Sequence, residues 1–167
     1  MLIGGAALAT CGILAVTVIG LRAADEADVD RGRYLVTVGG CNDCHTPGYL
    51  VKAGNVPEDR WLVGDSIGFS GPWGTTYPSN LRRLLANMSE DDWVRYARTL
   101  ETRPPMPWFN LRAFAEDDLR AMHRYIRSLP GDDRTVPDYV PPDPPTHDAA
   151  YRDGAAGAQA IGRRIPA

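Results

Sequence analysis

Residues 41–45 read Cys-Asn-Asp-Cys-His, the most informative stretch of the chain. Its two thiols lie three positions apart, and a histidine directly follows the second thiol. Thiolate and imidazole groups suit soft and borderline metals, iron included. The glycine pair at residues 39–40 comes immediately before and is typical of a helix end. The motif is therefore predicted to follow a short helix.

C-x-x-C-H is the spacing of covalent haem attachment. Two thiols at this spacing can add to the two vinyl groups along one porphyrin edge, and the adjacent histidine then lies under the ring centre and binds iron. We therefore predict one covalently attached haem c per chain. Cys41, Cys44 and His45 would bind it.

Two other readings of the cysteine pair remain open. A structural zinc site needs four ligands, and the remaining cysteine and histidines are Cys11, His123 and His147. Cys11 lies in an apolar stretch and His147 in a proline-rich tail, which disfavours zinc. A redox dithiol is disfavoured because no strand–helix–strand pattern surrounds the motif.

Composition divides the 167 residues into three parts: an apolar segment (1–24), a globular domain (25–131) and a tail rich in Pro, Ala and Gly (132–167). We expect the tail to be extended and largely disordered. The net charge of −3 argues against a nucleic-acid partner.

Residues 2–21 contain no charged side chain and are numerous enough to span a bilayer. They are either a cleaved export signal, ending near Ala23 and Ala24, or an uncleaved membrane anchor. The length favours the anchor, because the apolar part of a signal peptide is usually about 7–15 residues long. Both readings place the rest of the chain outside the cytoplasm.

The domain is predicted to be all-α. Helices are expected over residues 28–39, 80–87, 89–100 and 116–129, and an ordered loop over 46–79. Ser89 and Asp92 form a capping-box pattern. In the first helix, Tyr34, Leu35 and Val38 form the predicted apolar stripe. Three prolines within residues 103–108 exclude both helix and central strand from that segment.

A second iron ligand is sought among the methionines outside the apolar segment. Met106 lies between two prolines that would stiffen its backbone, so it is the favoured ligand. Met88 is the alternative, whereas Met122 lies on an apolar helical stripe and is expected to pack in the core. His123 is expected to face away from the iron. A histidine ligand or an open site is the remaining possibility.

Other roles can be assigned from residue type. Pro47 could carry the backbone carbonyl that orients His45. The candidates for the haem wall are Trp61, Trp73, Tyr77 and Trp108. The candidates for contact with the haem propionates are Asn80, Arg82 and Arg83.

Residues 31–129 resemble the small monohaem cytochromes c, and most of all the cytochrome c domains found with bacterial periplasmic dehydrogenases. The matching residues are Gly32 and Tyr34, Cys-x-x-Cys-His-Thr-Pro-Gly at 41–48, Gly71-Pro72-Trp73-Gly74, Pro105-Met106-Pro107-Trp108, and Asp118-Leu119 through Tyr125-Ile126-Arg127-Ser128-Leu129. Ala115 departs from the pattern, because that family commonly has a capping Ser or Thr there.

The resemblance implies a cytochrome c fold, with three to five short helices and long loops around one haem. It also implies a loop methionine ligand and a near-perpendicular crossing of the first and last helices. Gly32 would let Tyr125 approach closely at that crossing, and Tyr34 would pack beside it.

The expected function is electron transfer rather than catalysis. The chain would carry electrons from a dehydrogenase or quinol oxidoreductase to a downstream acceptor in the bacterial periplasm, close to the inner membrane if residues 2–21 anchor it. The alternative is a haem enzyme or gas sensor, resembling a peroxidase, with an open sixth coordination site. A structural zinc module is the third possibility.

Overall fold

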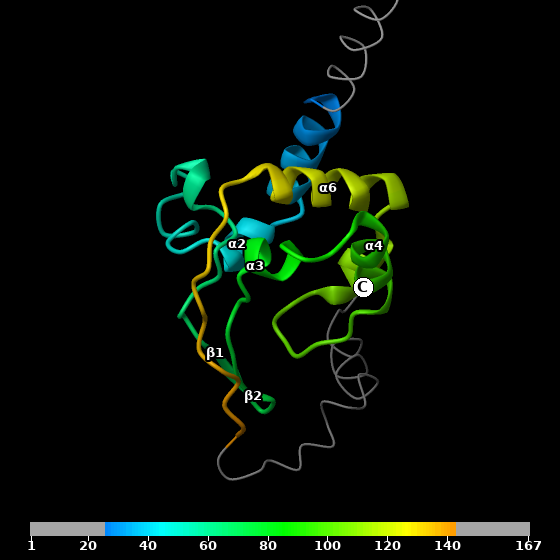
Figure 1. The fold of residues 1–167 in the computed structure, drawn as a ribbon. Coiled ribbons are helices and arrows are strands. Elements are labelled where there is room, and N and C mark those ends of the chain that lie inside the picture. The colour runs from blue at the N-terminus through cyan, green and yellow to red at the C-terminus, as the bar shows by residue number, and fades with distance from the viewer. Residues whose placement is uncertain (1–25, 143–167) are drawn as a thin grey trace, which may run out of the picture.

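The computed structural model describes residues 26–142, which form short helices joined by long loops (Figure 1). The expectations for residues 1–24 and 143–167 lie outside this part. The described residues are helical over 26–38, here named the N-terminal helix, and again in α2 (Cys41–His45), η1 (Glu58–Arg60), α3 (Leu81–Leu85), α4 (Glu90–Thr99), α5 (Trp108–Ala113) and α6 (Glu116–Ser128). None of the helices described is both long and apolar enough to cross a membrane.

The N-terminal helix crosses α6 in close contact (Figure 1). A Cβ atom at Gly32 would lie 2.0 Å from the Ala121 carbonyl oxygen and 2.7 Å from the Tyr125 Cβ atom. Only glycine allows this approach of the two backbones. The expected contact between Gly32 and Tyr125 is therefore confirmed, and Tyr125 is buried.

The buried face of the N-terminal helix differs from the predicted stripe. Leu35 and Val36 are buried, whereas Tyr34 and Val38 are 56% and 59% exposed. The reason is that the crossing is centred on Gly32, so residues three and four positions further on face α6. The expectation that Tyr34 packs beside Tyr125 is wrong; its ring instead lies 5.5 Å from the Arg31 guanidinium carbon.

Helices α4 and α6 pack against each other in the core. The predicted capping box of α4 is confirmed: the Asp92 N–H donates to Ser89 Oγ, and the Ser89 N–H donates to Asp92 Oδ2. The buried Trp93 donates its indole N–H to the Leu119 carbonyl oxygen across 2.8 Å. Helix α6 begins at Glu116 although Ala115 offers no side-chain cap.

Two short strands, the short helix η1 and helix α5 were not expected from the sequence. Strands β1 (Phe69–Gly71) and β2 (Gly74–Thr76) form an antiparallel hairpin, so the domain is mostly helical rather than purely all-α. Each strand has three residues, too few for an alternating apolar pattern to be recognised. Helix α5 begins directly after Pro107. Proline is tolerated at the start of a helix, so the proline-rich segment does not prevent a helix from following it.

Residues 132–142, here named the strap, lie against the domain (Figure 1, yellow to orange). Thr75 and Val140 exchange two backbone hydrogen bonds of 2.7 and 3.0 Å. At the other end, Asn80 Nδ2 donates to Asp132 Oδ1 across 2.8 Å. The prediction of a disordered tail from residue 132 onward is therefore wrong for this part. Composition alone missed the two anchoring points.

Candidate functional site

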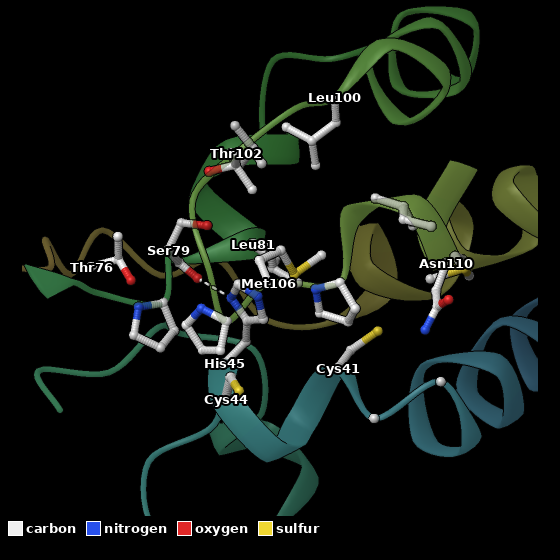
Figure 2. A pocket seen from close by; sticks show the side chains of 18 of the residues that line it. Cys41, Cys44, His45, Thr76, Ser79, Leu81, Leu100, Thr102, Met106 and Asn110 are labelled. Carbon is white, nitrogen blue, oxygen red and sulfur yellow. Dashed lines mark hydrogen bonds between the residues drawn. The ribbon is translucent and has the colours of Figure 1, made fainter. Parts of the chain in front are cut away.

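A large, mainly apolar cavity opens beside α2 and is lined by Cys41, Cys44, His45 and Met106 (Figure 2). It contains about 1180 Å³ of non-protein space when its open side is included. Its apolar walls come from segments far apart in the sequence: Phe69, Tyr77, Leu81, Leu84, Trp93, Tyr96, Leu100, Leu111, Phe114, Met122 and Ile126. The four side chains that were predicted to bind one cofactor thus line one space.

Helix α2 directs both cysteines toward this cavity. Gly40 precedes the helix with φ at +70°, a left-handed conformation that favours glycine. One helical turn then places Cys41 and Cys44 on the same face. Both are free thiols. Burial raises the pKa of Cys41 to about 11 and also raises that of Cys44, which favours the protonated form of both thiols.

His45 is buried and held in one orientation. Its Nδ1 atom lies 2.7 Å from the Ser79 carbonyl oxygen, which can only accept a hydrogen bond. The proton therefore resides on Nδ1, and the Nε2 lone pair is left for another partner. Burial also lowers the pKa of His45, which favours the neutral ring. Ser79, not Pro47, supplies the orienting carbonyl.

The end of α2 is fixed by polar contacts with the loop that follows it. Thr46 Oγ1 donates to Asn42 Oδ1 across 2.7 Å and accepts from the Leu62 N–H across 2.8 Å. The Gly64 N–H donates to the His45 carbonyl oxygen across 2.9 Å. These bonds hold the backbone from which both thiols and the imidazole project.

Met106 reaches the cavity from the loop between α4 and α5, here named the Met106 loop (residues 100–107). Its carbonyl oxygen accepts from the Trp108 N–H across 2.9 Å. Two residues earlier, the Pro104 carbonyl oxygen accepts from Thr76 Oγ1 across 2.8 Å. Figure 2 shows the Met106 thioether and the His45 ring directed into the same cavity.

The other candidate ligands lie elsewhere or serve the core. Met88 does not line the cavity, and its carbonyl oxygen accepts from His123 Nε2 across 2.9 Å. His123 is buried and does not line the cavity either. Met122 contributes to the cavity wall but is 1% exposed and packed in the core from α6.

Most of the aromatic residues predicted for the haem wall do not line the cavity. Tyr77 lines the cavity, but Trp61, Trp73 and Trp108 do not. Trp61 donates its indole N–H to the Val56 carbonyl oxygen and packs edge-on against Tyr49. Trp93, in α4, faces the cavity instead. Trp93 reaches the cavity because α4 packs on α6, and this packing cannot be predicted from the residue type alone.

The predicted propionate partners are also misplaced. Asn80 is bonded to Asp132, and the buried Arg82 donates to the Pro130 and Glu58 carbonyl oxygens. The cavity is not lined by Asn80, Arg82 or Arg83. Among the described residues, the cavity-lining side chain with a permanent charge is Arg103. Nothing in the local sequence around Arg103 indicates that this arginine would line the cavity.

The described residues contain no group of three or more His, Cys, Asp or Glu side chains placed to hold a metal ion. A structural zinc site built from such side chains therefore finds no support between residues 26 and 142. By contrast, the thiols, the oriented imidazole and the apolar walls fit a flat, largely apolar cofactor held at its edge.

The chain is similar to two curated proteins. It is 32% identical over 133 residues to the cytochrome c subunit of a gluconate 2-dehydrogenase from Pantoea cypripedii. It is 28% identical over 128 residues to the cytochrome c subunit of an alcohol dehydrogenase (quinone) from Gluconobacter oxydans (strain 621H). These alignments cover 71% and 63% of this chain, but only 30% and 24% of the relatives.

The chain thus spans about a quarter to a third of the length of these relatives. No family model matches the chain, and no solved structure matches it significantly. The mostly helical arrangement of short helices and loops is consistent with a cytochrome c fold.

Proposed function

We propose that this chain is a c-type cytochrome that transfers electrons through one covalently attached haem. The observation that carries the proposal is that Cys41, Cys44, His45 and Met106 all line one cavity with apolar walls. The names of the two relatives support it, since both are cytochrome c subunits of dehydrogenases.

The residues of α2 would attach and orient the group. Cys41 and Cys44 would form the two thioether bonds, and His45 would offer Nε2 to the iron. The hydrogen bond to Ser79 supports this, because a proton fixed on Nδ1 keeps Nε2 available and makes the imidazole a stronger ligand. When bound, haem supplies a one-electron couple whose potential depends on its axial ligands.

Met106 would supply the second protein ligand to the iron. A thioether ligand would raise the reduction potential relative to ligation by two histidines, and an iron held by both protein ligands would leave no site for a substrate. The chain would then act as an electron-transfer protein that binds no substrate at the iron. Arg103, the permanent cation on the cavity wall, would pair with a haem propionate.

The donor is proposed to be a dehydrogenase, as the names of the relatives suggest. A quinol oxidoreductase is the other possible donor, and a downstream redox protein would take the electron. We place this exchange in the bacterial periplasm. Residues 2–21 would export the domain, either as an inner-membrane anchor or as a cleaved signal.

The test compares Met106→Ala with Met88→Ala, which removes a methionine outside the cavity. Each variant is purified as ferric holoprotein, and the weak absorbance band at the red end of the visible spectrum, diagnostic of a methionine–iron bond, is recorded. We expect the band in the wild type and in Met88→Ala, and its complete loss in Met106→Ala. High-spin ferric iron in the wild type, together with ready binding of carbon monoxide after reduction with dithionite, would instead support a haem enzyme or gas sensor.

A further inference from the structure

The strap is connected to the Met106 loop by two separate routes. In the first, the Tyr139 ring lies 3.7 Å from the Arg103 guanidinium carbon, three residues before Met106. This is a close cation–π contact. Tyr139 is itself fixed, because its hydroxyl group donates to the Trp73 carbonyl oxygen across 2.8 Å.

The second route passes through the hairpin. Val140 pairs with Thr75 through two backbone hydrogen bonds, and the next residue, Thr76, donates its hydroxyl to the Pro104 carbonyl oxygen. Gly74 makes this close contact possible, because a Cβ atom there would lie 2.3 Å from the Val140 carbonyl oxygen. Both routes therefore end on consecutive residues, Arg103 and Pro104.

The strap is anchored far from these contacts as well. Asn80 Nδ2 donates to Asp132 Oδ1 and to the Arg134 carbonyl oxygen, across 2.8 and 3.1 Å. A Cβ atom at Gly64 would lie 2.6 Å from Val136 Cγ1, which shows how tightly the middle of the strap packs. Figure 1 shows it running from the end of α6 to the hairpin. A segment held along its length can restrain whatever it contacts.

We infer that the strap is a positioning element that holds the Met106 loop closed, with Tyr139 as the residue that transmits the restraint. Methionine is a weak ligand on an irregular loop, so its retention depends on how often that loop opens. The strap would act through Arg103 and Pro104, the two residues at which its routes end. This inference rests on Met106 being the sixth ligand, as proposed above.

Competition by imidazole measures loop opening. An added ligand binds the iron only in the fraction of molecules whose loop is open, and its apparent affinity rises in proportion to that fraction. In ferric Tyr139→Leu, which loses both the ring contact and the hydroxyl bond, we expect imidazole to bind roughly fivefold to thirtyfold more tightly than in the wild type. The methionine–iron band should disappear at correspondingly lower imidazole concentrations.

Tyr34→Leu is the matched control. Tyr34 also lies next to an arginine, at 5.5 Å from the Arg31 guanidinium carbon, but on the N-terminal helix and outside the cavity lining. Its imidazole affinity should equal that of the wild type. Thr76→Val tests the second route independently, because it removes the hydroxyl bond to Pro104, and it decides the matter should Tyr139→Leu fail to accumulate.

Unchanged imidazole affinity in Tyr139→Leu, or in Thr76→Val if that variant has to decide, overturns the inference. So does an equal increase in Tyr139→Leu and Tyr34→Leu, since that would indicate general loosening. These outcomes differ from failure of the proposed function. In that case the wild type lacks the methionine–iron band, or Met106→Ala retains it, and the strap inference falls with it.

Discussion

The two sides of the cavity are built in different ways. On one side, α2 brings two thiols and an imidazole together within five consecutive residues, and a single helical turn sets their directions. On the other side, Met106 lies in an irregular loop whose neighbours Arg103 and Pro104 are held by contacts from Tyr139 and Thr76. The first side is defined by local sequence, the second by long-range contacts.

This difference suggests a division of labour. Covalent attachment at α2 would fix the cofactor permanently, so that side needs little support beyond a few hydrogen bonds. The Met106 side would form only a weak coordinate bond, so its geometry depends on the surrounding fold. Substitutions on the α2 side should therefore change whether haem is bound. Substitutions elsewhere should change how well the bound haem is enclosed.

The largest contrast is expected from Cys41→Ala combined with Cys44→Ala. This double variant removes both proposed thioether bonds, so no haem should remain with the polypeptide after denaturing electrophoresis. Met106→Ala should retain all of it, because its bond to iron is not covalent. Haem staining of the gel distinguishes the two. Equal staining in the double variant and the wild type would contradict covalent attachment at α2.

A smaller effect is expected where the N-terminal helix, which leads into α2, crosses α6. Gly32→Ala places a methyl group 2.0 Å from the Ala121 carbonyl oxygen, and the helices must separate. We expect the free energy of unfolding of the holoprotein to fall by about 3 kcal/mol, the upper end for overpacking. Urea titration measures the change.

Gly131→Ala is the control for this substitution, because a Cβ atom at Gly131 would have no neighbour within 4 Å. Its unfolding free energy should stay within about 0.5 kcal/mol of the wild type. If Gly32→Ala and Gly131→Ala were equally stable, the close crossing of the two helices would be wrong.

The two sides of the cavity also differ in how much of them could be predicted from the sequence. The C-x-x-C-H spacing and the capping box at Ser89 each depend on a few residues at fixed spacing, and the close approach at Gly32 was implied by the resemblance to the small monohaem cytochromes c. Those three predictions were therefore possible without a structure. Met106 was selected by its flanking prolines, and it does line the cavity.

Features that depend on tertiary contacts escaped prediction. Ser79 orients His45 from a position 34 residues away, and no local pattern indicates it. Arg103 could not be distinguished from other arginines, because its place on the cavity wall depends on how the Met106 loop folds. The strap has the proline-rich composition of a disordered tail. The same prolines are also compatible with an extended segment that pairs with the edge of a hairpin.

The most direct test of the central claim is the intact mass of the exported chain, purified under denaturing conditions from cells with a haem-attachment system. Whatever the fate of residues 1–24, we predict a mass equal to the polypeptide plus one haem. A colourless chain whose mass is that of its amino acids alone would contradict the account.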